Sequence, residues 1–171
     1  MVSTVLHLRP SLFSSILELS GSTGDYFMLN EADTCRKYIT PALRAADWDD
    51  DQIREQVTFT HGRIVPTGNR ILRKTQKRAD YLLYYTRDYP IAVVEAKDES
   101  HHVADGLPQA KEYAQTLGLR FAYASNGHGI LEFDCGTGAL KEIAAFPSPG
   151  ELWARANDLP LGSVDKLLAP T

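Results

Sequence analysis

The chain has 171 residues, of which 43% are hydrophobic and 23% are charged, with a formal net charge of −4. These values fit one globular domain with one core and exclude a simple disordered chain. The acidic balance argues against an autonomous tight DNA binder, so affinity for DNA would have to come from a local patch or from partners. No apolar run approaches the ~20 residues that span a bilayer. The amino terminus is a poor signal peptide and there are only two cysteines, which predicts a cytoplasmic protein.

A helix is expected over residues 31–46. Asn30 is a good N-cap, and Glu31 lies in the first turn, where an acid favours the helix dipole without any further role. Pro41 would kink this helix or reset its start, because proline removes a hydrogen bond from a helix interior. Residues 53–61 alternate in a way that fits a first strand.

A polar segment, residues 63–78, separates that strand from the next one. Five cations lie within nine residues near its end: Arg70, Arg73, Lys74, Lys77 and Arg78. Such a patch would suit guiding a phosphate backbone into a site. A flexible, solvated loop is an equally good interpretation, because Gly68 and Asn69 favour turns.

Two strands with charged ends form a predicted hairpin. Asp80 starts the first strand, and the second is apolar until it ends in Glu95-Ala96-Lys97. Arg87-Asp88, with Pro90 just after, supplies the chemistry of a tight turn. If Thr86 faces Tyr89, the numbers of paired residues sum to 175, and Asp80 lies across from Glu95 on the same face. A register slip of one residue would break this arrangement.

Two carboxylates at that separation repel each other unless a divalent cation lies between them or one is protonated. Oxygen ligands from Asp80 and Glu95, with a backbone carbonyl near Ala96, suit Mg²⁺. Such an ion could polarise a phosphodiester and generate hydroxide. Lys97 could orient the attacking water or neutralise charge in the transition state. The alternative is a surface hairpin with a rim salt bridge, of a kind worth only ~0–1 kcal/mol.

The remaining elements predict a mixed sheet with helices on its faces. Apolar residues recur at helical spacing from Leu107 to Leu117, and Gln109 and Tyr113 share a face beside that stripe. They could contact phosphate or position Lys97, or simply border an amphipathic helix. Strands are expected at 120–124, 130–134 and 140–144, the last two joined by a glycine-containing turn. A capping box at Ser148 and Glu151 predicts a final helix through Trp153 and Arg155.

Other polar groups have simpler interpretations. His101 and His102 are adjacent on a loop and are expected to face solvent rather than to bind zinc. Cys35 and Cys135 have no ligand spacing and are expected to be buried free thiols. Asn126-Gly127 is interpreted as turn geometry rather than as a catalytic pair.

Together Asp80, Glu95-Ala96-Lys97 and the helix segment Gln109 to Tyr113 resemble the PD-(D/E)xK nuclease core. The specific resemblance is to the amino-terminal endonuclease domain of the R subunit of type I restriction-modification enzymes, over about residues 29–155. Four further segments of the sequence resemble that family: Asn30 to Thr34, Arg78 to Tyr81, Phe121 to Gly127, and Phe146 to Trp153. One departure is Ala79, where a proline usually precedes the first acid; the type I proteins resemble this chain in lacking it.

The resemblance implies a restriction endonuclease-like α/β fold and a Mg²⁺-dependent nuclease of double-stranded DNA, in which Mn²⁺ may substitute. It implies that Asp80, Glu95 and, more loosely, Glu31 bind metal, that Lys97 is catalytic, and that Gln109 and Tyr113 support DNA contact or cleavage. It implies methyltransferase and specificity subunits as partners. ATP would act only through a motor domain, because this chain has no Gly-x-x-x-x-Gly-Lys-Ser/Thr loop.

The expected domain organisation is an extension and flexible joint at 1–28, the nuclease domain at 29–157, and a tail or linker at 158–171. The chain is expected to be a fragment or a stand-alone nuclease module. Two other functions stay open. A DNA repair or recombination nuclease of the same fold would cut ends, flaps or junctions without a methyltransferase partner. A docking module would leave cleavage by the assembled complex intact after Glu95→Ala.

Overall fold

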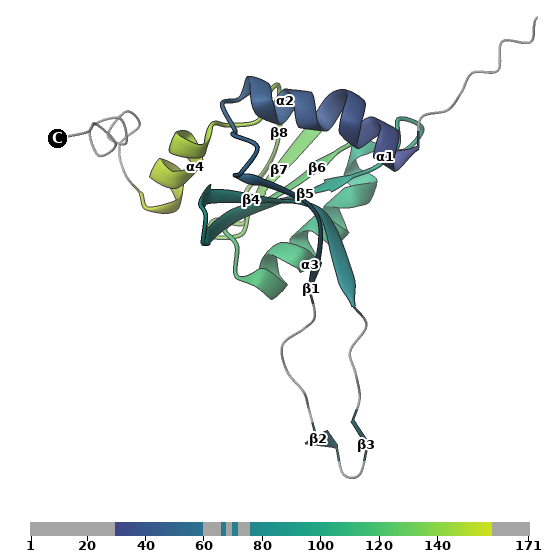
Figure 1. Ribbon diagram of the computed structural model, residues 1–171, viewed down its shortest axis with the longest axis vertical. Helices are drawn as coiled ribbons and strands as arrows, with labels where there is room; N and C mark the ends of the chain where they lie inside the picture. The colour runs from purple at the N-terminus through teal and green to yellow at the C-terminus, as the bar shows by residue number, and fades with distance from the viewer. Residues whose placement is uncertain (1–29, 60–65, 68–69, 72–75, 159–171) are drawn as a thin grey trace, which may run out of the picture.

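The structure is a computed structural model that describes residues 30–59, 66–67, 70–71 and 76–158 (Figure 1). Several predicted features lie outside these ranges: the joint near residues 20–24, Thr60 and His61 of the first strand, the cations Arg73 and Lys74, and all but the first residue of the tail. No helix in the described ranges is long and apolar enough to cross a bilayer.

A six-stranded mixed sheet forms the centre of the fold. Its strands follow the order β1-β4-β5-β6-β7-β8, and all neighbouring pairs are antiparallel except β5 and β6. The strands are β1 (Ile53–Phe59), β4 (Lys77–Thr86), β5 (Tyr89–Ala96), β6 (Phe121–Ser125), β7 (Ile130–Asp134) and β8 (Leu140–Ile143). The predicted mixed sheet is therefore confirmed. A separate short pair, β2 (Pro66–Thr67) and β3 (Arg70–Ile71), projects beyond the ends of β1 and β4 (Figure 1).

Helices cover both faces of this sheet (Figure 1). One face carries α1 (Glu31–Thr34), the π-helical turn η1 (Cys35–Ile39) and α2 (Thr40–Ala45); the other carries α3 (Leu107–Leu117), which follows the 3₁₀ turn η2 (Val103–Gly106). The core is accordingly split in two. Ile39 and Leu43 pack with Tyr81 and Val94 on the first face, whereas the α3 side chains pack with Leu82 and Val93 on the second. The α3 connection joins the two parallel strands, as a parallel pair requires.

Pro41 is expected to kink the first helix or reset its start, and a new α-helical segment, α2, does start at Thr40 with Pro41 in its first turn. Helical backbone continues from residue 31 to residue 45, but residues 35–39 form a π turn in which the Thr40 N–H donates to the Cys35 carbonyl. Proline lacks an N–H and its ring clashes with the carbonyl four residues earlier. A wider turn just before Pro41 accommodates both defects without ending the helix.

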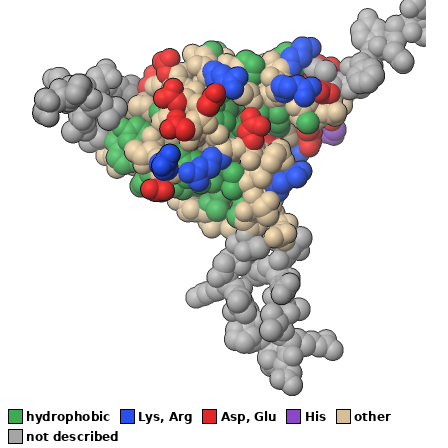
Figure 2. Space-filling view, in the orientation of Figure 1, with side chains coloured by type: hydrophobic (Ala, Val, Ile, Leu, Met, Phe, Trp, Pro, Cys, Tyr) green, Lys and Arg blue, Asp and Glu red, His purple; other side chains and the backbone are tan. Residues whose placement is uncertain are grey.

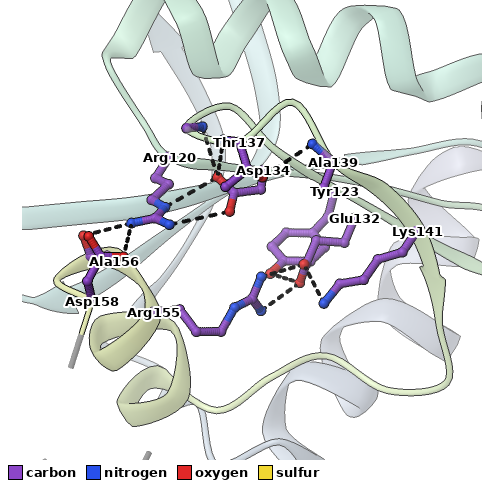
Figure 3. A network of polar contacts seen from close by, with 11 residues as sticks. Arg120, Tyr123, Glu132, Asp134, Thr137, Ala139, Lys141, Arg155, Ala156 and Asp158 are labelled. Carbon is purple, nitrogen blue, oxygen red and sulfur yellow. Dashed lines mark hydrogen bonds and ion pairs between the residues drawn. The ribbon is translucent and has the colours of Figure 1, made fainter. Parts of the chain in front are cut away.

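The last helix, α4 (Pro149–Ala156), begins at the predicted capping box of Ser148 and Glu151. Its Arg155 forms a two-pronged contact with the buried Glu132 carboxylate of β7, at 3.0 and 2.5 Å (Figure 3). Tyr123 and Lys141 contact the same carboxylate at 2.8 and 3.1 Å. These contacts fix α4 to the sheet and satisfy an acid that would otherwise be costly to bury.

Candidate active site

The β4–β5 hairpin has the predicted register next to the site. Tyr81 pairs with Val94, Leu82 with Val93 and Leu83 with Ala92, so the numbers sum to 175. An irregularity at Tyr84 breaks the pattern near the turn, yet Thr86 still faces Tyr89. Continuing the register by one pair places Asp80 across from Glu95, the residue before the last one of β5.

Asp80 is held from both sides. The Ala96 N–H donates to its Oδ2 at 2.9 Å, and the Gln56 amide of β1 donates to its Oδ1 at 3.1 Å. Burial raises the pKa of the Asp80 carboxyl; these two hydrogen bonds oppose the shift and the charge of Glu31 adds to it. Gln56 could not be predicted from the sequence, because the pairing of β1 with β4 is not visible in the chain order.

Glu95 is 2% exposed. Its Oε2 is buried and has no hydrogen-bond partner within the described ranges. Burial, followed by the charge of Asp80, raises the pKa of this carboxyl to about 8, although Lys97 opposes the shift. A buried carboxylate oxygen without a partner is costly. A proton or a cation bound to this oxygen would offset that cost.

Lys97 links the strand end to the first helix. Its Nζ lies 3.3 Å from Glu95 Oε1 and 3.0 Å from Glu31 Oε1. Burial alone would lower the pKa of Lys97, but the bonds and charges of the two acids raise it overall. Lys97 is therefore held as an ammonium. Through this contact Glu31, which is distant in sequence, lies next to the end of β5.

The turn before α3 closes over these side chains. A Cβ added at Gly106 would lie 3.4 Å from the Cγ atoms of both Glu95 and Lys97 and from the Cβ of Ala124. Gly106 is itself buried. This backbone therefore forms a close wall of the site, a role for which the sequence carries no local signal.

Gln109 and Tyr113 lie together on α3, as their spacing predicted. The Gln109 amide donates to the Tyr113 hydroxyl at 2.7 Å. Tyr113 is 6% exposed and packs edge-on against Phe59 at 5.0 Å between ring centroids. Burial raises the pKa of this phenol, and the charges of Glu95 and Asp80 raise it further. Tyr113 thus lies within the electrostatic field of the two acids.

Two of the five predicted DNA-binding cations can be placed by their side chains. Lys77 forms an ion pair with Glu112 and lies 5.8 Å from the centre of the Tyr113 ring, whereas Arg78 is exposed at the start of β4. The backbone of Arg70 lies in β3. On the face shown in Figure 2, Lys and Arg side chains are interspersed with Asp and Glu.

The side chains of the site offer oxygen donors for a divalent cation. Within the described ranges, no three His, Cys, Asp or Glu side chains already converge as a metal-binding group, and the Glu31 carboxylate contacts Lys97. The donors that are present still fit a hard cation: Glu95 has a buried oxygen without a partner in the described ranges, the charge of Asp80 acts on the same carboxyl, and all of these ligand atoms are oxygen. The residues therefore fit Mg²⁺ through Asp80 and Glu95. The predicted assignment of Glu31 as a metal ligand stays a prediction.

The remaining predicted groups are placed away from this chemistry. His101 and His102 are both exposed, as expected, but His102 also accepts the Ala104 N–H and caps η2. Cys35 and Cys135 are free thiols, as predicted, but they are half-buried rather than buried. Both lie at the margins of the two core clusters.

The Asn126-Gly127 pair is turn geometry, as predicted. Asn126 accepts the N–H groups of His128 and Gly129 at 3.1 and 3.0 Å. Gly127 has a φ of +87°, a conformation that favours glycine.

Known proteins similar to this chain were found by sequence and by structure. Residues 55–128 match the family model of the type I restriction enzyme EcoKI endonuclease subunit second domain. The type I restriction enzyme EcoAI endonuclease subunit of Escherichia coli is 39% identical over 134 residues, which cover 74% of this chain and 16% of that protein. A fragment assigned to an HsdR subunit of a type I restriction enzyme from Vibrio vulnificus YJ016 is 51% identical, with a TM-score of 0.66, over 84% of this chain and 29% of that one.

The chain thus spans 16% of the E. coli subunit and 29% of the Vibrio chain. The family model covers both hairpin strands with Asp80, Glu95 and Lys97, together with Gln109 and Tyr113. All three matches agree with the resemblance that these residues carry. The chain belongs to the family of type I restriction enzyme endonuclease subunits and has the restriction endonuclease-like fold of their amino-terminal domain.

Proposed function

We propose that this chain is a Mg²⁺-dependent endonuclease domain that hydrolyses phosphodiester bonds of double-stranded DNA within a type I restriction complex. The observation that carries the proposal is the buried Glu95 Oε2, which has no hydrogen-bond partner among the described residues and belongs to a carboxyl whose pKa burial and then the charge of Asp80 raise. The family match supports the restriction role in general. The metal and the reaction are inferred from the site.

The two acids would hold the cation. Asp80 is already oriented by the Ala96 N–H and the Gln56 amide, so little conformational freedom would be lost when it ligates. Glu95 would offer its unpartnered oxygen. A bound Mg²⁺ would supply Lewis acidity toward a phosphodiester oxygen and lower the pKa of a nearby water.

Lys97 would act on charge. Its ammonium is held by Glu95 and Glu31, which fixes a positive charge where the phosphorane-like transition state becomes more negative. The Tyr113 hydroxyl accepts from Gln109, and its own hydrogen can therefore be donated toward a phosphate oxygen or water. Gln109 and Tyr113 would thus position the DNA strand beside the acids.

The wider assembly is part of the same proposal. DNA would reach the site past the cations of residues 70–78: Arg70, Arg73, Lys74, Lys77 and Arg78. The partners would be methyltransferase and specificity subunits in the cytoplasm, and ATP would act only through a motor domain outside this chain. The division into an extension, a nuclease domain and a tail remains a prediction.

Metal binding by the whole chain tests the proposal first. Mn²⁺ titrated calorimetrically at pH 8.5 is expected to bind the wild-type chain. Asp80→Asn and Glu95→Gln should each weaken binding at least about tenfold. Asp98→Asn is the matched control. Asp98 is an acid three residues after Glu95, and its carboxylate contacts the Ser100 hydroxyl and the His101 ring. Equal affinity in all four proteins, or no binding by wild type, would overturn the proposal.

DNA cleavage tests the reaction itself. The same variants, placed in the full R subunit and assembled with its partners, should leave supercoiled plasmid uncut, while Asp98→Asn cuts it normally. Cleavage that survives Glu95→Gln would favour the docking module. Cutting of flaps or junctions without a methyltransferase partner would favour a repair nuclease.

A further inference from the structure

Gln56 has an unusual backbone conformation for its position. Its φ is +54° in the middle of the edge strand β1, in the left-handed region that side chains rarely adopt. The other described non-glycine residues with positive φ are Asp47 and Asp158. Each of them directly follows the C-cap of a helix, where this conformation is ordinary. Gln56 alone among the described residues carries it inside a strand.

The inversion does not come from an inserted residue. Glu55 pairs with Tyr81 and Val57 pairs with Ala79, so the β1–β4 register is the same on both sides of Gln56. Position 56 therefore faces Asp80 across the ladder. The strained backbone therefore leaves the strand pairing intact. Its main effect is on the direction of the peptide group and side chain of Gln56.

The side chain points to the candidate metal ligand. The Gln56 Nε2 donates to Asp80 Oδ1 at 3.1 Å, and the other Asp80 oxygen receives the Ala96 N–H. Gln56 is exposed, so burial of its side chain does not offset the strain. Strained residues that persist tend to occur where the strain serves a site. Here the conformation brings an amide to the one carboxylate oxygen that β5 does not hold.

We infer that Gln56 is a positioning residue, which uses a strained backbone to fix the Asp80 carboxylate in the orientation that a divalent cation requires. This inference rests on the proposed function. Groups that orient a metal ligand commonly change metal affinity 10–100-fold when removed. Gln56 would act through Asp80 and need not touch the metal or the DNA.

Two variants separate the strain from the hydrogen bond. Gln56→Gly removes the amide and also relieves the strain, because glycine adopts positive φ readily. Gln56→Ala removes the amide and keeps the strain. Thr58→Ala is the control, since Thr58 is also exposed on β1 and pairs with Arg78 rather than Asp80. The readouts are Mn²⁺ affinity by calorimetry and the melting temperature of the metal-free chain.

Both Gln56 variants are expected to bind Mn²⁺ 10–100-fold more weakly than wild type. Gln56→Gly should nevertheless melt about 2–4 °C higher than Gln56→Ala, whereas Thr58→Ala should retain wild-type affinity. A merely structural role for Gln56 would make affinity follow melting temperature. Unchanged affinity in Gln56→Gly would overturn the inference and leave the proposed function standing. A wild-type chain that binds no Mn²⁺ would overturn both.

Discussion

The Lys97 ammonium lies 3.3 Å from Glu95 Oε1, while Glu95 Oε2 is buried with no partner among the described residues. The same ammonium also contacts Glu31. One cation therefore faces three acids when Asp80 is included. Lys97 offsets only part of this negative charge, and the remainder favours either a proton on Glu95 or a second positive charge.

The raised pKa of Glu95 predicts how stability depends on pH. The pKa rises from 4.5 to about 8 on folding, so the folded chain binds this proton more tightly than the unfolded chain. The free energy of unfolding should therefore fall between about pH 4.5 and pH 8 and level off above. Each pKa unit corresponds to about 1.4 kcal/mol. Urea denaturation at several pH values should show this slope in wild type and lose most of it in Glu95→Gln.

Saturating Mn²⁺ should reverse the loss in wild type at pH 8.5, because a cation that binds only the folded state stabilises it. Glu95→Gln should gain much less from the metal. A pH slope that is identical in wild type and Glu95→Gln would show that other groups dominate and would contradict the prediction.

Lys97→Met should separate metal binding from cleavage. The substitution removes the cation that competes for Glu95 and Glu31, so Mn²⁺ affinity should be kept or increased. Cleavage by the assembled subunit should still fall about 10²–10³-fold, because a fixed charge near the transition state is lost. The checks are calorimetry and a plasmid cleavage assay on the same preparation.

Lys111→Met is the control for that experiment. Lys111 is a lysine of α3 whose Nζ lies 3.7 Å from the centre of the Phe133 ring. It should leave both readouts unchanged. If Lys97→Met lowers metal affinity and cleavage in parallel, Lys97 supports the site structurally and has no separate role in the reaction.

Local signals predicted the parts of the site that depend on adjacent sequence. The turn at Arg87-Asp88 and the alternation of the two strands fixed the register that brings Asp80 to Glu95. The helical spacing of four residues likewise predicted that Gln109 lies beside Tyr113, and the two side chains are hydrogen-bonded. In both cases a single element or hairpin determines the contact, because side-chain direction follows the strand or helix period.

Contacts between distant segments could not be predicted in this way. Lys97 and Glu31 are 66 residues apart. The strained φ of Gln56 can be related to Asp80 only because β1 pairs with β4. The π turn before Pro41 is similar: the sequence indicates a defect in the helix but not how the backbone accommodates it. Such features depend on tertiary packing, which a periodic pattern does not specify.

Arg155→Ala should destabilise the fold without touching the site. Arg155 is the two-pronged partner of Glu132, whose side chain is 2% exposed. Its loss leaves the buried carboxylate with Tyr123 and Lys141 as its partners among the described residues (Figure 3). The expected cost is about 3 kcal/mol, the low end for breaking a buried ion pair. Urea denaturation at neutral pH measures it.

Arg44→Ala is the matched comparison, because the Arg44–Asp50 pair is exposed on both sides. It should cost less than about 1 kcal/mol. Equal losses in the two variants would mean that the Glu132 network contributes no more than a surface ion pair. Mn²⁺ affinity should be unchanged in both, since neither arginine contacts the acids of the candidate site.

Two glycines with left-handed backbone should differ in their tolerance of alanine. Gly118 has a φ of +67° and open space around it, whereas a Cβ on Gly127, at φ +87°, would lie 2.6 Å from Tyr38 Cδ2. Gly118→Ala should therefore cost only the conformational strain, about 1 kcal/mol. Gly127→Ala should cost roughly 1–3 kcal/mol more, because the Tyr38 ring must also move. Denaturant unfolding of both variants measures the difference, and adding Tyr38→Ala should abolish the excess. An excess that persists without the ring would place the cost of Gly127→Ala in the backbone alone.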